Sequence, residues 1–255
     1  MAASAFLVEG PHAVGEVLAG GHPVRELFVT DAAADRDVAL MRVAAERGIA
    51  LRVLTERVMA RLGDTVTPQG VVAVVDLPDA DLDRLLAGSP RLLALLDGVA
   101  DPGNAGTVIR TADALGADGV VLTAGSVDVY AGKVVRSAAG SLLHLPVVPA
   151  VDPTEALDRI RTAGLSILAT AADGDDSLDE LIGTDVLDRP TAWLFGNEAH
   201  GVRPELLAAA DRRVSVPLWG RAESLNLAAT AAICLHASAR AQHRDIAHNQ
   251  ALYAE

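Results

Sequence analysis

The feature that most constrains the fold is a regular alternation of short apolar runs with helical stretches. From Arg91 onward there are six such runs, which read LLALLD, GVVLT, LPVV, LSILAT, TAWLF and RVSVP. Helical segments of ten or more residues separate most of them. Strands that alternate with helices favour a parallel sheet, because each crossover helix packs back onto one of its faces. We therefore predict an α/β fold with a mostly parallel sheet covered on both sides.

The first 77 residues carry a second, smaller α/β pattern. The stretch GPHAVGEVLAGG predicts a helix with Val14, Val17 and Leu18 on one face. Strands at VRELFV, IALRVL and GVVAVV alternate with further helices near 37–47 and 55–62. The acidic, turn-rich segment that follows is typical of a linker with one helical turn. The expected organisation is a small domain, a linker and a larger domain, at residues 1–77, 78–90 and 91–255.

Charge and cysteine content exclude several classes of protein. The net charge of −13 argues against a protein that coats nucleic acid nonspecifically, although a local basic site stays open. The single cysteine, Cys234, excludes an internal disulfide framework and a cysteine-based metal cluster, and it is expected to be buried. No apolar run is long enough to span a bilayer, and the first residues lack the pattern of a signal peptide. We expect a soluble, cytoplasmic protein.

The stretch DGVADPGNAGTVIR follows the first of the six strands. A strand, a glycine-bearing loop and a helix suggest a phosphate site, but neither GxGxxG nor GK[ST] is present. Asn104 and Arg110 could be an ordinary helix cap and a solvated side chain. Alternatively, both could face a ligand at the carboxyl end of the strand, with Val108, Ile109 and Ala112 on the buried side of the helix.

Two further stretches carry polar residues after predicted strands. In TAWLFGNEAHGVRPELL the strand ends at Gly196, where glycine permits close approach of a ligand, and a helix begins near Pro204. In VSVPLWGRAESLNLAATAA, Ser224 is predicted as the N-cap of the last helix, which extends beyond Arg240. Asn226 is then expected on its first turn, with no structural role assigned.

Taken together and in this order, NAGTVIR, FGNEAHG and VPLWGRAESLNLAATAA resemble the three motifs of the SpoU-type branch of the SPOUT methyltransferases. The resemblance covers residues 91–240. The first 77 residues resemble, more loosely, a small ribosomal-protein-like RNA-binding module. Spacing alone predicts an ordinary open sheet, whereas the resemblance implies a deep trefoil knot in the C-terminal segment, a rare exception among folds.

The resemblance also implies an activity. It indicates a homodimer, with its site near the subunit interface, that methylates a ribose 2′-hydroxyl in rRNA or tRNA. The methyl donor would be S-adenosylmethionine, held largely by backbone groups, and no metal would be needed. The implied cofactor-binding residues are Thr170, Ala171, Leu194, Phe195, Gly196, Asn197, Val216, Pro217, Leu218 and Leu225.

The implied catalytic residues are Arg110, Asn104, Glu198, Ser224 and Asn226. An arginine normally stays protonated, so we expect Arg110 to orient the ribose and stabilise the developing alkoxide, with an RNA phosphate as proton acceptor. The other four would fix the ribose and the surrounding loop by hydrogen bonds. Local phosphate contacts are expected from Arg25, Arg52, Arg110, Lys133 and Arg136.

Three functions stay open on the sequence. A modifier of large-subunit rRNA is favoured, either as a housekeeping enzyme or as one that protects a drug site. A tRNA methyltransferase is less favoured, because the tail RDIAHNQALYAE is not basic. The alternative from another class is a non-catalytic RNA-binding or ribosome-assembly factor on the same scaffold.

Overall fold

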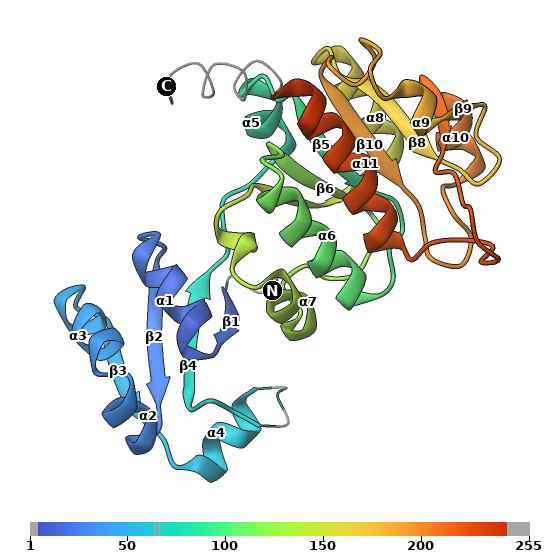
Figure 1. The fold of residues 1–255 in the computed structure, drawn as a ribbon. Coiled ribbons are helices and arrows are strands. Elements are labelled where there is room, and N and C mark those ends of the chain that lie inside the picture. Colours follow the sequence, from blue (N-terminus) through green and yellow to red (C-terminus); the bar gives the residue numbers. More distant parts are fainter. Residues whose placement is uncertain (1–4, 64, 66, 244–255) are drawn as a thin grey trace, which may run out of the picture.

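The computed structural model describes residues 5–63, 65 and 67–243, which form two β-sheets (Figure 1). The C-terminal tail on which the argument against tRNA rests, residues 244–255, lies outside the described residues.

The smaller sheet belongs to the N-terminal part of the chain. Its strand order is β1-β4-β2-β3, with β4 antiparallel to β1 and β2, and β2 parallel to β3. The strands are β1 Ala5–Glu9, β2 Val24–Val29, β3 Ala50–Val53 and β4 Val71–Asp76. The helices are α1 Pro11–Ala19, α2 Asp31–Arg36, α3 Val38–Glu46 and α4 Glu56–Leu62. Val14, Val17 and Leu18 are buried on α1 as predicted, whereas β1 and α2 are additional elements.

The larger sheet has the order β7-β6-β5-β10-β8-β11-β9, and each of its neighbouring pairs is parallel. Its strands are β5 Leu92–Leu96, β6 Gly119–Thr123, β7 Val147–Val151, β8 Ser166–Thr170, β9 Asp176–Ser177, β10 Thr191–Phe195 and β11 Arg212–Ser215. All six predicted strands are present, and the prediction of an α/β fold with a parallel sheet is confirmed. The short strand β9 was not predicted.

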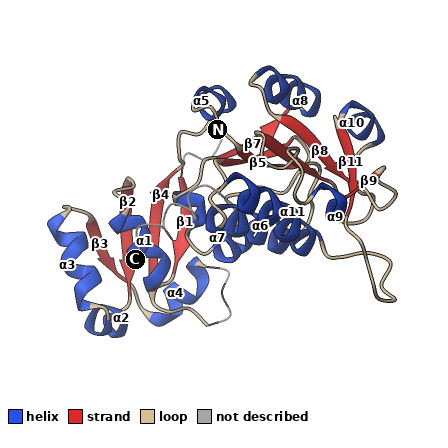
Figure 2. Cartoon of the chain, turned by 45° about the horizontal axis from the view of Figure 1, so that its top comes forward, coloured by secondary structure: helices blue, strands red, loops and turns tan. Residues whose placement is uncertain are grey.

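Helices cover both faces of this sheet (Figure 2). One face carries α6 Pro102–Ala114, α7 Gly132–Ala138, α9 Leu178–Leu181 and α11 Leu227–Gln242, with the 3₁₀ turn η1 Ser141–Leu143 nearby in the chain. The other carries α5 Leu82–Ala87, α8 Pro153–Thr162 and α10 Pro204–Ala209. Alternate residues of β5 enter two separate apolar clusters, Leu92 and Leu96 on one side, Leu93 and Leu95 on the other. Burial on both faces explains why the strands are continuously apolar.

The direction of winding reverses next to β5. The chain runs outward from β5 through β6 to β7, then crosses to the other side, where β10 pairs with β5 and β8 follows. In open α/β sheets a ligand crevice forms at the carboxyl ends of the strands where the order reverses. The loops after β5 and β10 therefore lie together at the position where this fold can bind a ligand.

The start of the last helix differs from the prediction. Ser224 is not its N-cap; α11 begins at Leu227, and the cap is Asn226, whose Oδ1 accepts the backbone N–H groups of Ala228 and Ala229 at 2.8 and 3.3 Å. Both residue types are good caps. The local sequence could not separate them, because the partner that holds Asn226 in place comes from another part of the chain.

The two sheets meet at α7. Arg136 on α7 donates a hydrogen bond to Glu9 of β1 at 3.1 Å, and the rings of Phe6 and Tyr130 lie 5.2 Å apart. Burial at this contact raises the pKa of the Tyr130 hydroxyl. The N-terminal sheet is thus held against the same helical layer that carries α6.

Candidate functional site

A buried ion pair joins the loops that follow β5 and β10. Asp97 directly follows β5 and is only 1% exposed, and the Nε of Arg203 donates to both of its carboxylate oxygens at 3.0 Å. Thr123 donates a further hydrogen bond to Asp97 at 2.9 Å. Burial opposes ionisation of Asp97, but the bonds from Arg203 and Thr123 outweigh it and hold the pKa of this carboxyl below its ordinary value. The pair fixes the second loop against the first.

Gly196 allows the chain to fold back on itself at the end of β10. A Cβ at this position would lie 2.0 Å from the backbone carbon of Gly201 and 2.0 Å from the backbone nitrogen of Val202. The loop closes through mutual backbone hydrogen bonds between Asn197 and Gly201, at 2.9 and 2.8 Å. The Asn197 amide donates to the Gly98 carbonyl at 2.7 Å. Only glycine fits here, because backbone rather than a movable side chain fills the space.

The Glu198 carboxylate organises the loop before α6. It accepts the backbone N–H groups of Ala100 and Asp101, each at 3.1 Å, and the side-chain amide of Asn104 at 3.0 Å. Partial burial acts against its ionisation, but these hydrogen bonds prevail and keep the pKa of Glu198 below its ordinary value. Glu198 is therefore an anionic clamp on the loop.

Asn104 joins this clamp to the last helix. Asp101, not Asn104, is the N-cap of α6, since its carboxylate accepts the Asn104 backbone N–H at 2.8 Å. The Asn104 side chain can therefore bind residues that are distant in the sequence. Its amide group donates to Glu198, and its oxygen accepts from Asn226 at 2.9 Å. We call Asn226, Asn104 and Glu198 the amide–carboxylate chain. It brings together one predicted residue from each of the three sequence stretches.

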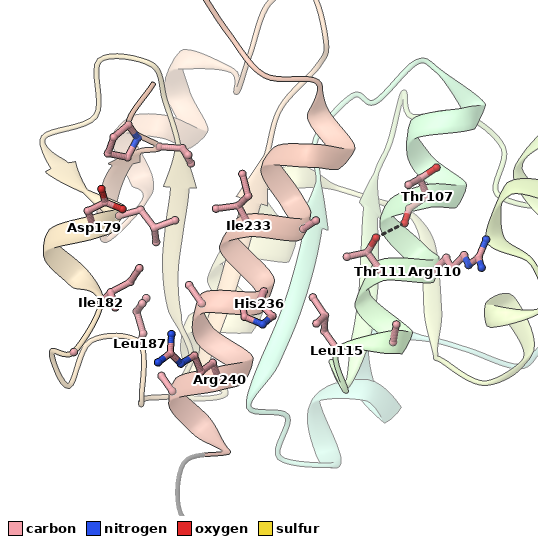
Figure 3. Close-up of a pocket in the computed structure, with 18 residues that line it drawn as sticks. Thr107, Arg110, Thr111, Leu115, Asp179, Ile182, Leu187, Ile233, His236 and Arg240 are labelled. Carbon is pink, nitrogen blue, oxygen red and sulfur yellow. Dashed lines mark hydrogen bonds between the residues drawn. The ribbon is translucent and has the colours of Figure 1, made fainter. Parts of the chain in front are cut away.

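Arg110 stands apart from the amide–carboxylate chain. Its side chain is exposed on α6 and makes no hydrogen bond or ion pair with any described residue. In Figure 3 it extends from α6 away from α11. The guanidinium is therefore available for a ligand or for a second chain.

Six of the ten predicted cofactor residues line one cavity of about 370 Å³: Thr170, Ala171, Val216, Pro217, Leu218 and Leu225. The predicted catalytic residue Ser224 also lines it. They come together because β8 and β11 are neighbours in the sheet. The Thr170 hydroxyl also donates to the Leu194 carbonyl of β10 at 3.2 Å.

The other four predicted cofactor residues do not line this cavity. Leu194 and Phe195 have fully buried side chains, so that only their backbone groups could reach a ligand, and Gly196 and Asn197 form the folded-back loop. The volume of the cavity is within the range of small-molecule sites, and its lining of apolar groups with a few polar ones is typical of such sites.

A larger groove, of about 860 Å³, lies between α6, α9 and α11 (Figure 3). Its lining is mainly apolar and includes Leu115, Ile182 and Ile233, with Arg110 at its border. Val216 and Pro217 line both the groove and the smaller cavity. The groove holds few of the predicted cofactor residues, so its size alone does not identify it as the cofactor site.

The predicted phosphate contacts other than Arg110 are engaged in ion pairs. Arg25 pairs with Asp76, Arg52 with Glu26, Lys133 with Asp101 and Arg136 with Glu9. Most of these pairs are solvent-exposed, where an ion pair contributes little to stability and can be exchanged for another anion. Their role towards RNA stays a prediction.

Comparison with known proteins identifies the family. Residues 91–236, more than half of the chain, match the model of the SpoU rRNA Methylase family. The chain belongs to this family. Residues 7–80 match a second model, described as RNA 2′-O ribose methyltransferase substrate binding.

Several characterised proteins are similar over most of their length. The chain is 38% identical to the 23S rRNA (guanosine(2553)-2′-O)-methyltransferase of Bacillus subtilis, over 91% of this chain and 87% of that protein. It is 36% identical to the 23S rRNA (uridine(2479)-2′-O)-methyltransferase of Streptomyces viridochromogenes, over 93% and 83%. The crystal structure of the SpoU methyltransferase AviRb from Streptomyces viridochromogenes, in complex with the cofactor AdoMet, superimposes with a TM-score of 0.80 at 34% identity, covering 93% of this chain and 90% of that one.

Within residues 5–63, 65 and 67–243, no group of three or more His, Cys, Asp or Glu side chains is placed to hold a metal ion. Nor does that part of the chain contain a helix long and apolar enough to cross a membrane. Cys234 is buried as expected, and burial raises the pKa of its thiol.

Sequence reasoning missed Asp97 and Arg203. An acidic residue directly after a buried strand is a signal that could have pointed to Asp97. Nothing in the sequence connects it to an arginine 106 positions further on.

Replacing Asp97 by alanine should lower the free energy of unfolding by about 2 kcal/mol. This is below the usual cost of breaking a fully buried pair, because the Arg203 side chain remains 39% exposed and can reach water. Urea unfolding of Asp97→Ala beside Asp97→Asn, which keeps the side-chain volume, would measure it. An unchanged unfolding midpoint for Asp97→Ala would mean that the pair does not hold the loops together.

Proposed function

We propose that this protein transfers a methyl group from S-adenosylmethionine to a ribose 2′-hydroxyl of 23S rRNA. The observation that carries the proposal is the amide–carboxylate chain: residues from all three motif stretches meet at the crevice beside the cavity. The relatives, named as 23S rRNA 2′-O-methyltransferases, supply the substrate class. The AdoMet complex of AviRb supplies the cofactor.

We assign S-adenosylmethionine to the smaller cavity, whose volume of about 370 Å³ and mixed apolar and polar lining suit a small molecule. When bound, it supplies a methyl group made electrophilic by its sulfonium, so the protein need only position the acceptor. Thr170, Ala171, Val216, Pro217, Leu218 and Leu225 would surround it there. Contacts from the backbone of Leu194, Phe195, Gly196 and Asn197 are part of the same proposal, supported by the Thr170–Leu194 hydrogen bond.

We assign the catalytic roles according to which side chains already have hydrogen-bond partners within the protein. The Glu198 carboxylate and the Asn104 amide have partners within the protein, so they would hold the loop rather than abstract a proton. Asn226 would fix the same loop from the side of α11, and Ser224, which lines the cavity, would contact the ribose. Arg110 retains its donors and would orient the ribose and stabilise the alkoxide as methyl transfer proceeds. An RNA phosphate would accept the proton.

The proposed organisation has a substrate-binding domain at 1–77, a linker at 78–90 and a catalytic domain at 91–255. The family match to residues 7–80 supports the first part. A trefoil knot in the C-terminal segment is proposed with it. The ground for the knot is the resemblance of the three motif stretches; the bond between Asn226 and Asn104 adds that the segment after β11 returns to the loop after β5. An rRNA substrate in turn favours a cytoplasmic location.

We propose further that two copies associate through the groove between α6 and α11. Its apolar lining includes Ile233, which is 41% exposed in the single chain. Since Val216 and Pro217 line both the groove and the cofactor cavity, association would bring a second chain to the edge of the cavity. Arg110, which borders the groove, would then lie near the reaction.

Ile233→Glu is expected to weaken the dimer by about a hundredfold, because two-fold symmetry would bury the new carboxylate twice without a partner. Sedimentation equilibrium over a range of protein concentrations measures this. Val38→Glu is the matched control, since Val38 is 63% exposed but lies on α3, away from the groove. A dimer of unchanged affinity in Ile233→Glu would exclude this face as the interface.

The direct test of function is transfer of radiolabelled methyl from S-adenosylmethionine to unmodified 23S rRNA and to bulk tRNA. We expect label in 23S rRNA, recovered in alkali-resistant dinucleotides. Label in tRNA alone would favour the tRNA alternative. Cofactor binding without transfer to either RNA would favour the non-catalytic factor.

A further inference from the structure

One large aromatic side chain lies almost entirely in solvent. Trp219 is 88% exposed, whereas the other tryptophan, Trp193, is fully buried and donates its indole N–H to Ser238. Single exposed aliphatic side chains are common on protein surfaces. A nearly bare indole is not, because it leaves a large apolar area in water with nothing to offset it.

Trp219 lies on the segment between β11 and α11, residues 216–226, which we call the β11–α11 loop. This loop extends outward from the body of the protein (Figures 1 and 2). The residue before Trp219 is Leu218, which lines the cofactor cavity, and Glu223, Ser224 and Leu225 return to that cavity further along. The indole therefore stands at the edge of the cavity without being part of its lining.

A free cation accompanies the indole. Arg221 is exposed and has no hydrogen bond or ion pair with any described residue. Other arginines near this end of the sheet are paired with carboxylates, as Arg203 and Arg213 are. Glu223 is the acidic residue of this loop; it lines the cofactor cavity and forms no ion pair with Arg221. An aromatic plane with an arginine two positions away is the combination that binds single-stranded RNA, one through a base and the other through a phosphate.

We propose that Trp219 stacks on a nucleobase of the RNA next to the methylated ribose, and that Arg221 contacts the adjoining phosphate. The inference rests on the proposed function and adds the element that receives the target strand. Because stacking is tolerant of base identity, Trp219 would supply affinity and orientation rather than choice of sequence. The target nucleotide would have to be unpaired or extruded from its helix to be held in this way.

The positions of the two cavities favour RNA, rather than the cofactor or a second chain, as the partner of Trp219. Trp219 lines neither the cofactor cavity nor the groove between α6 and α11. A cover for the cofactor would face the cavity, and a dimer contact would continue the apolar groove. An exposed cation two positions from the indole suits a polyanion better than either.

Fluorescence gives a readout of this contact that does not require methyl transfer. Trp193 is fully buried, out of reach of a ligand at the surface, so the solvent-exposed part of the emission belongs to Trp219. Titration of the wild-type protein with transcribed, unmethylated 23S rRNA fragments should quench that emission. Trp219→Phe should remove the quenching while keeping a ring that can stack.

Substitutions at Trp219 and Arg221 test whether these side chains contribute to RNA affinity. Trp219→Ala is expected to raise the Kd for the same RNA about tenfold or more, and Trp219→Phe by no more than about threefold. Arg221→Ala should raise it about threefold to tenfold and make its dependence on salt shallower. Arg189→Ala is the control for lost charge, since Arg189 is also exposed but lies two residues before β10, at its amino end. S-adenosylmethionine affinity, measured by calorimetry, should be unchanged in all of them.

Other results would overturn the inference. Quenching by S-adenosylmethionine alone would make Trp219 a cover for the cofactor. A change in emission with protein concentration, without RNA, would place it against a second chain. Equal RNA affinity in Trp219→Ala and wild type would exclude stacking. Quenching by RNA in a protein that transfers no methyl group would instead disprove the proposed function and, with it, the place of the stacked base next to a methylated ribose, while the contact between Trp219 and RNA would stand.

Discussion

Arg110→Ala should lower kcat for methyl transfer by about a hundredfold to a thousandfold, the range observed when one donor to a developing oxyanion is removed. The KM for S-adenosylmethionine should stay within about twofold of wild type, because Arg110 does not line the cofactor cavity. The side chain is exposed and has no partner among the described residues, so its loss should leave the fold intact. Single-turnover transfer to 23S rRNA, with the cofactor saturating, measures the effect on the chemical step.

Arg110→Lys separates charge from geometry. Lysine keeps the positive charge but loses the planar fork that can hold two oxygens at once. If orientation of the ribose matters, the lysine variant should remain at least about tenfold below wild type. Recovery of full activity by lysine would reduce the role of Arg110 to its charge. Wild-type activity in Arg110→Ala would remove Arg110 from the mechanism altogether.

Gly196→Ala should destabilise the protein by about 1–3 kcal/mol and weaken S-adenosylmethionine binding by at least about tenfold. The added methyl group would overlap the backbone of Gly201 and Val202, so the folded-back loop would have to open. Opening it would move Asn197 from Gly98 and withdraw the Glu198 clamp from the loop before α6. Urea unfolding measures the change in the free energy of unfolding, and calorimetric titration measures the affinity for S-adenosylmethionine.

The control for this prediction is Gly220→Ala. Gly220 has an ordinary φ and nothing within 4 Å of an added Cβ, so the same substitution should be tolerated there. Equal stability and cofactor affinity in Gly196→Ala would show that the loop can close differently. A loss of stability with unchanged cofactor affinity would separate the folded-back loop from the cofactor site.

The secondary structure could be predicted where periodicity was strong. The apolar runs from Leu92 to Leu96 and from Thr191 to Phe195 identify strands because both of their faces are buried. The errors lie where local signals compete. Ser224 and Asn226 are both suitable caps. Asn226 is the N-cap because its amide is held by Asn104, which is 122 residues away in the sequence. Short elements such as β9 form only because a neighbouring strand supplies partners.

The alternation of strands and helices, the parallel sheet and the three stretches that carry the site can all be read from local spacing and burial. Which of those residues act together depends on how the chain packs. The parallel order places the ends of β5, β10, β8 and β11 along one edge, and side chains about a hundred positions apart then meet at hydrogen-bond distance. The Asp97–Arg203 pair and the exposure of Trp219 are decided in the same way. The position of a side chain relative to water and to distant partners is a property of the packed chain, and no local pattern encodes it.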